Sequence, residues 1–136
     1  MCARGAPTRL PVIVRAATHT MHVIDHTCLP RDSAEGRECQ TVASPALCGV
    51  PFEVRVLRLA PGAATPAGCC ERARVVLVLG GSGKERRDGC PQGFHAPCTL
   101  HVPAGAEHQI VNNGVTTLQL VVIAAPVTEA ASASPP

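Results

Sequence analysis

The sequence has almost no aromatic side chains: among its 136 residues there are two Phe, and neither Tyr nor Trp occurs. Sites that stack bases or sugar rings need aromatic faces, so this composition argues against a stacking nucleic-acid or carbohydrate site. The net charge is only +2, from 12 Lys and Arg against 10 Asp and Glu. A surface that tracks a phosphate backbone is far more basic, and we therefore expect no nucleic-acid partner.

Long hydrophobic runs are also missing. The longest, Val75–Leu79 and Leu120–Ala125, are much shorter than the roughly 20 residues that a membrane-spanning helix needs. Arg4, Arg9 and Arg15 interrupt the start of the chain, which therefore lacks the apolar core of a secretory signal. These features predict a cytoplasmic protein with no membrane partner.

Cysteine is frequent, but its pattern is not that of a disulfide scaffold or a zinc ribbon. The eight Cys amount to about 6% of the chain, below the roughly 8–10% of disulfide-rich domains. No two of them have the CxxC spacing of a structural zinc site. We expect reduced thiols. The adjacent pair Cys69 and Cys70 is the unusual feature.

Short runs rich in Val and Ile, separated by Gly and Pro turns, predict an all-β domain. We expect one domain over residues 10–127, after a ragged N-terminus at 1–9 and before a disordered tail at 128–136. Two turn-rich stretches, Asp25–Pro51 and Ser82–Pro97, read as connections. The expected strands are Pro11–Ala16, Thr20–Ile24, Phe52–Leu59, Val75–Leu79 (buried on both faces), Thr99–Val102, Gln109–Val111 and Thr117–Ile123.

Two segments together resemble the cupin family. The stretch PAGAEHQIVN contains Pro103, Gly105, His108 and Asn112 at the spacing of the second cupin motif, P-x-G-x-x-H-x-x-x-N. The stretch PGAATPAGCCERARVVLVLGGSG has the Pro-Gly turn and the Gly-ended strand of the first motif. The resemblance covers residues 52–126. It implies a jelly-roll, or double-stranded β-helix, barrel in one domain, and a homodimer.

The first motif departs from the family pattern where the metal ligands should stand. The family's two histidines of this motif fall at Gly68 and Cys70, and its glutamate falls at Arg74. Of the four usual ligand positions, only His108 keeps its residue. Glycine has no donor atom, and a guanidinium repels a cation, so the three-His, one-Glu set is absent.

Three functions remain open. In the first, the metal site is remodelled, and Arg74 and His108, with His101 as a further candidate, bind a small anionic molecule; a guanidinium suits a carboxylate or phosphate. In the second, Cys70, His108 and Cys69 hold a zinc, iron or copper ion in an oxygenase or isomerase. In that enzyme the catalytic candidates are Cys70 and His108. They are also the candidates in an enzyme without metal, in which Arg74 would lower the pKa of the Cys70 thiol. The third is a structural or regulatory ligand-binding module without metal. In each, the scarcity of aromatics predicts a pocket lined by Val, Leu and Ile.

Overall fold

The computed structural model describes residues 21–87 and 90–126, and in these ranges the chain is all-β. The strands form two antiparallel sheets. The six-stranded sheet has the order β1-β2-β3-β10-β5-β8, and the four-stranded sheet has the order β4-β9-β6-β7. The strand bounds are β1 Asp32–Ala34, β2 Arg37–Ala43, β3 Glu53–Leu59, β4 Gly68–Cys69, β5 Arg74–Gly80, β6 Ser82–Arg87, β7 Cys90–His95, β8 Cys98–Val102, β9 Glu107–Val111 and β10 Leu118–Ala124.

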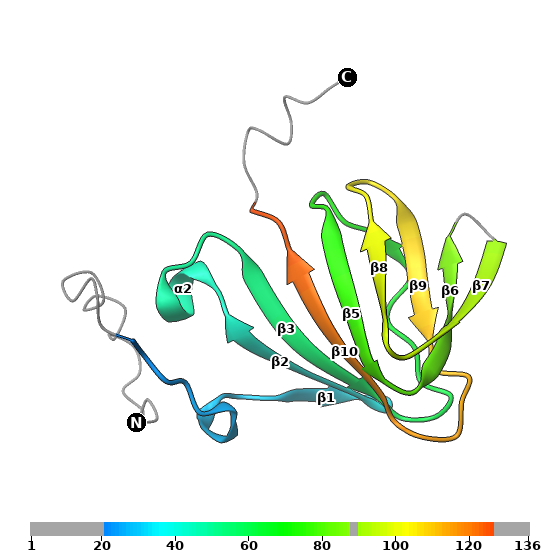
Figure 1. Cartoon of the computed structure of the whole chain (residues 1–136), viewed down its shortest axis with the longest axis horizontal. Helices are drawn as coiled ribbons and strands as arrows, with labels where there is room; N and C mark the ends of the chain where they lie inside the picture. The colour runs from blue at the N-terminus through cyan, green and yellow to red at the C-terminus, as the bar shows by residue number, and fades with distance from the viewer. Residues whose placement is uncertain (1–20, 88–89, 127–136) are drawn as a thin grey trace.

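The hydrophobic core lies on the inward face of the larger sheet, where the smaller sheet packs on it. Figure 1 shows the four-stranded sheet near β5 and β8, with β1 and β2 at the far edge of the larger sheet. This is the jelly-roll arrangement that the sequence predicts. The fully buried core residues are Leu59, Val76, Val78, Ile110, Leu118 and Leu120.

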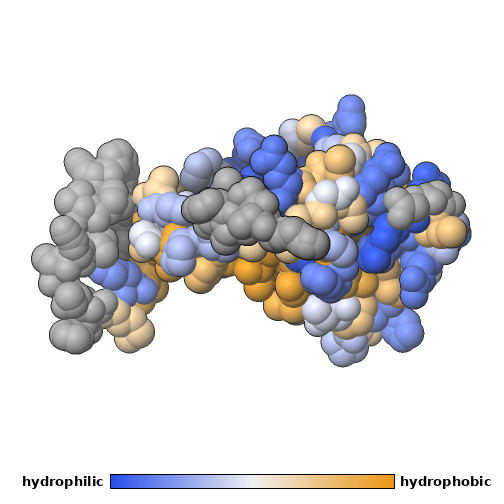
Figure 2. Space-filling model, turned by 90° about the horizontal axis from the view of Figure 1, so that it is seen from above, coloured by the Kyte–Doolittle hydropathy of each residue, from blue (hydrophilic) through white to orange (hydrophobic). Residues whose placement is uncertain are grey.

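Alternation along β3 decides which side chains enter the barrel. Leu57 and Leu59 belong to the core or pack against it, so the odd-numbered residues of this strand face inward. Arg55 therefore shares the inward face with them. Val54 and Val56 face outward, and each pairs with an apolar residue of β10. Figure 2 shows apolar surface along the middle of the molecule, between more polar regions.

The interpretation of Asp25–Pro51 as a connection is wrong. It contains the short 3-10 turn η1 (His26–Cys28), the strands β1 and β2, and the four-residue helix α2 (Pro45–Cys48). Glu35 and Gly36 join the two strands with φ angles of 52° and 82°. Two successive positive φ values are typical of the tight turns that match the twist of a hairpin.

The second turn-rich stretch, Ser82–Pro97, is also ordered, as the hairpin of β6 and β7. Its glycines hide the strand pattern, and at Gly83 the reason for glycine is steric. A Cβ there would lie 2.6 Å from the carbonyl oxygen of Val111. The close approach of β9 to β6 thus needs a residue without a side chain.

Three further predictions concern the N-terminal strands and the chain ends, the burial of β5, and the state of the thiols. Met21–Ile24 form no strand, and the predicted strand Pro11–Ala16 and both predicted disordered ends lie outside the described residues. Leu79 is 59% exposed, so β5 is not buried on both faces. Cys28 is disulfide-bonded, which corrects the expectation of reduced thiols at that position. Within the described ranges, no helix is long and apolar enough to cross a membrane.

Candidate functional site

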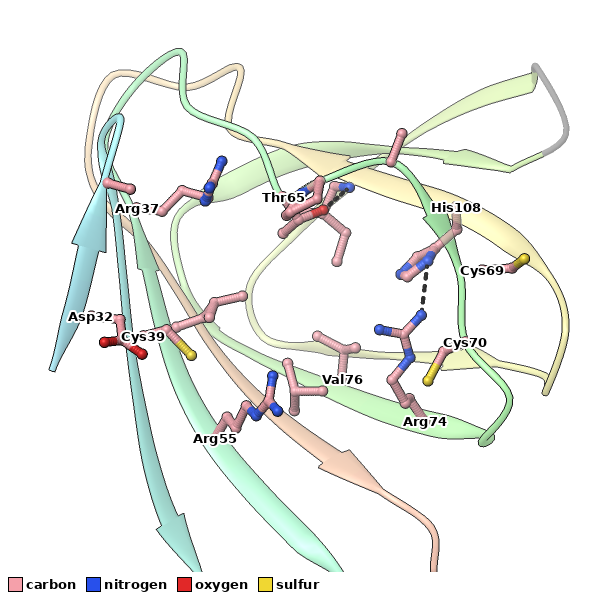
Figure 3. Close-up of a pocket in the computed structure, with 17 residues that line it drawn as sticks. Asp32, Arg37, Cys39, Arg55, Thr65, Cys69, Cys70, Arg74, Val76 and His108 are labelled. Carbon is pink, nitrogen blue, oxygen red and sulfur yellow. Dashed lines mark hydrogen bonds between the residues drawn. The ribbon is translucent and has the colours of Figure 1, made fainter. Parts of the chain in front are cut away.

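A cavity of about 470 Å³ opens on the inward face of the larger sheet. Its walls come from β1, β2, β3, β5, β9 and β10, and the segment Thr65–Cys70 closes one side (Figure 3). This volume suits a small molecule. The lining residues that matter below are Asp32, Arg37, Arg55, Leu57, Cys69, Cys70, Arg74, Val76, His108, Ile110 and Val122.

The floor of the cavity is aliphatic and follows from strand register. Val122 of β10 pairs with Val76 of β5 on one side and with Arg55 of β3 on the other. Arg74 lies two residues before Val76 and therefore projects from the same face of the sheet. Aliphatic side chains thus separate two guanidinium groups, and the lining contains the Val, Leu and Ile that the sequence predicts.

Arg74 and His108 meet inside the cavity. The Nη2 atom of Arg74 lies 3.2 Å from Nδ1 of His108, and Figure 3 shows the two side chains facing each other. A guanidinium can only donate a hydrogen bond, so Nδ1 accepts and the imidazole proton sits on Nε2. The histidine therefore offers one N–H to the cavity and no free lone pair.

Burial lowers the pKa of His108, which is 7% exposed, and the positive charge of Arg74 lowers it further. Glu85 acts in the opposite direction, and Arg87 lowers the pKa again. Since the ordinary value is about 6.5, His108 is neutral at pH 7. This protonation state agrees with its role as an acceptor toward Arg74.

Arg74 has an unsatisfied hydrogen-bond donor. Its Nε atom is buried and has no hydrogen-bond partner among the described residues. Leaving a buried donor of a charged group unpaired costs stability. The charged residues that line the cavity are mostly positive. They are Arg37, Arg55 and Arg74, and Asp32 is the one carboxylate among the described lining residues.

The residues at the family's metal-ligand positions do not fit a metal ion. Gly68 pairs directly with His108 across β4 and β9, which places it at a ligand position without a donor atom. Arg74 brings a positive charge and occupies Nδ1 of His108, while Nε2 carries the proton. Across the described ranges, no group of three or more His, Cys, Asp or Glu is arranged to hold a metal ion.

The cysteine and histidine candidates separate in space. Cys70 is half-buried and lies beside Arg74, whereas Cys69 is exposed and its sulfur points away from the Arg74–His108 pair (Figure 3). His101 of β8 pairs with Val75, on the outward face, and does not line the cavity. The fold therefore brings Cys70, Arg74 and His108 together and leaves His101 apart.

Sequence reasoning missed the arginines that enter from the other side. Arg37 belongs to the stretch interpreted as a connection, so its strand was not recognised. Arg55 lies in a strand that the sequence predicts, and its side chain is on the other face of that strand from Val54 and Val56. The signal was the unbroken alternation of Arg55, Leu57 and Leu59, which marks the odd-numbered residues as one face.

No family model matches the sequence, and no curated protein matches it. Solved structures do resemble the fold. A cupin 2 conserved barrel domain protein from Salinispora arenicola has a TM-score of 0.64 and 21% identity, over 79% of this chain and 89% of that chain. A predicted oxalate decarboxylase from Thermotoga maritima has a TM-score of 0.69 and 16% identity, over 78% and 100%.

A third structure is a cupin-superfamily sugar phosphate isomerase from Silicibacter pomeroyi, with a TM-score of 0.66 and 20% identity over 78% of this chain and 76% of that chain. At these identities the likeness concerns the fold. The chain therefore has the cupin barrel fold that its two motifs predict.

Proposed function

We propose that this protein binds a small anionic molecule in the cavity, with Arg74 and His108 as its main contacts. The observation that carries the proposal is the Arg74–His108 pair in a cavity whose described lining has three arginines and one carboxylate. A carboxylate or phosphate oxygen would accept from the guanidinium of Arg74, and charge-assisted bonds of this kind are about twice as strong as neutral ones.

His108 suits the same ligand. With Nδ1 engaged by Arg74, its Nε2–H is a donor, and its lowered pKa keeps the ring neutral at pH 7. Arg74 then supplies the charge and His108 a directed hydrogen bond. The aliphatic lining around them lowers the local dielectric, which strengthens both contacts.

The names of two similar structures agree with an anionic ligand. Oxalate and sugar phosphates, in the names of the predicted decarboxylase and of the isomerase, are anions. Those names concern proteins at 16% and 20% identity, so they support the ligand class and no particular reaction.

The alternative of a metalloenzyme with Cys70 and His108 as ligands is disfavoured by the donor set. A metal on His108 would have to displace Arg74 from Nδ1 or remove the proton from Nε2. We expect protein purified without a histidine tag and incubated with zinc or iron to hold no stoichiometric metal. Stoichiometric metal that is lost in His108→Ala would overturn this expectation.

Ligand binding can be tested by thermal shift and calorimetry with butyrate and inorganic phosphate as probes. We expect at least one of them to raise the melting temperature of the unmodified protein. Arg74→Gln and His108→Gln should each remove that shift. Arg86→Gln is the matched control, because Arg86 is an exposed residue of β6 outside the cavity lining. Absence of a shift with either anion, or a shift that survives Arg74→Gln, would contradict the proposal.

A further inference from the structure

We propose that the ligand of this cavity is a dianion, with one acidic group at Arg74 and a second at Arg55. The inference rests on the proposed anion binding and specifies its ligand. The shared chemistry is a pair of carboxylate or phosphate groups joined by a short aliphatic segment. What carries it is the placement of two arginines on either side of an apolar floor.

The register fixes this placement. Arg55 and Val76 lie on opposite sides of Val122, each one strand away from it. Arg74 lies two residues from Val76 on the same face, so strand spacing and rise place the Cα atoms of Arg55 and Arg74 about 12 Å apart. Both side chains point into the cavity (Figure 3).

Arg55 is available to a ligand. Its Nη2 atom lies 3.4 Å from each carboxylate oxygen of Glu53, which is long for a hydrogen bond, and its side chain is 47% exposed. Exposed pairs of this kind contribute little. Glu53 also accepts from Arg72 at 3.3 Å, so it keeps a cationic partner when Arg55 turns to a ligand.

Arg37 is less available. It donates to the carbonyl oxygen of Ala64 at 3.3 Å and lies 3.6 Å from Glu35. We therefore assign it to the rim, where its charge adds to the field that attracts an anion. Between Arg55 and Arg74 the floor offers Val76 and Val122, which would exclude a ligand with hydroxyl groups throughout its middle.

The test is calorimetry at fixed ionic strength, because salt screens these contacts. Probes are butyrate as the monoanion, and dicarboxylates from malonate to adipate as dianions of increasing length. The carboxylate–phosphonate 3-phosphonopropionate serves as the mixed arm, since it distinguishes a phosphate-type end from a carboxylate end. We expect one dicarboxylate, of about glutarate's length, to bind at least tenfold more tightly than butyrate.

Three variants separate the contributions. Arg55→Gln should reduce the affinity for that dicarboxylate about tenfold, to the level of butyrate, and leave butyrate binding unchanged. Arg74→Gln should weaken both probes, and Arg86→Gln should change neither. Circular dichroism melting of each variant reports whether it folds; Arg55 is exposed, and we expect Arg55→Gln to melt as the unmodified protein does.

The failures are distinguishable. If butyrate binds through Arg74 but no dianion binds more tightly, the second contact is wrong and the proposed function stands. Equal loss of both probes in Arg55→Gln would likewise overturn the assignment of Arg55. If neither butyrate nor any dianion binds to the unmodified protein, the proposed function itself is wrong.

Discussion

Buried polar side chains near the two ends of strand β9 differ in whether they have hydrogen-bond partners. Directly after the C-terminal end of β9, Asn112 is fully buried, and both its amide nitrogen and its amide oxygen make hydrogen bonds. Its Nδ2 donates to the carbonyl oxygens of Leu59 and Thr116, each at 2.9 Å, and its Oδ1 accepts from the backbone N–H of Gly114 at 2.9 Å. At the cavity end, next to His108, the buried Nε of Arg74 has no partner among the described residues.

The presence or absence of hydrogen-bond partners distinguishes residues that stabilise the fold from residues that could bind a ligand, even within one sequence motif. The chain itself satisfies the three hydrogen-bonding positions of Asn112 described above, and leaving such a buried group unpaired would cost stability. A polar group left open beside a cavity keeps its capacity for a ligand. We therefore assign Asn112 to the fold and the Arg74–His108 pair to binding, although His108 and Asn112 belong to the same sequence motif.

The largest effect expected is on Asn112. Asn112→Ala removes three hydrogen bonds and leaves two carbonyl oxygens and one N–H without their buried partner. We expect a loss of about 3 kcal/mol in the free energy of unfolding, measured by urea denaturation. A loss below about 1 kcal/mol would show that water replaces the amide and would weaken the comparison.

Glu85 gives an intermediate case, a buried charge with a partner. Its side chain is 6% exposed, and it lies 2.7 Å from Nη2 of Arg87, which also donates to the carbonyl oxygen of His101 at 3.4 Å. Glu85→Gln removes the charge that Arg87 faces, and because Arg87 is 38% exposed, solvent compensates in part. We expect about 1–2 kcal/mol of destabilisation in the same urea assay. An unchanged urea midpoint of Glu85→Gln would show that Glu85 does not stabilise the fold.

The comparison predicts a much smaller stability effect at Arg74. Arg74→Leu eliminates an unsatisfied buried donor but also removes the hydrogen bond to Nδ1 of His108. The two effects oppose each other, so the free energy of unfolding should stay within about 1 kcal/mol of the original. The response to anions should vanish in the same variant. A loss near that of Asn112→Ala would mean that Arg74 serves the fold, and it would invalidate the distinction between the two ends.

Much of the fold was predictable because its strands carry local signals. β3, β5, β8, β9 and β10 show runs or alternation of branched apolar residues, and the two motifs supplied their connectivity. The hairpins β1–β2 and β6–β7 were missed because long-range pairing orders them. Both sequences are polar, and the β6–β7 hairpin also contains three Gly. One of them, Gly83, is required by the approach of β9, which no local pattern reveals.

The candidate site was predictable in part for the same reason. Motif spacing placed Cys70, Arg74 and His108 in one region, and the structure places all three at the cavity. The orientation of His101 and the arrival of Arg37 depend on how β8 and β2 pair with their neighbours, whereas the alternation along β3 already marked the face of Arg55. Those pairings are tertiary, and a single sequence does not state which face of a strand turns inward.

The smallest effect expected is the pH dependence that His108 contributes. Its pKa is lowered in the folded protein by burial and by Arg74 and Arg87, against the opposing charge of Glu85. The unfolded chain therefore takes up a proton first as the pH falls through about 6.5, where an unperturbed histidine titrates. Stability is then fully present above that pH and declines toward the lowered pKa of the folded state.

His108→Gln isolates this contribution, because the difference between the two proteins cancels the carboxylates that they share. Measured by urea denaturation from pH 8 to pH 5, the unmodified protein should lose more stability below pH 6.5 than the variant. A saturating anion adds negative charge beside the imidazole, raises its pKa and should reduce the difference. If the stability of the unmodified protein relative to His108→Gln is flat with pH, or increases as the pH falls below 6.5, the imidazole is not held neutral and the assignment of Nδ1 as the acceptor from Arg74 is wrong.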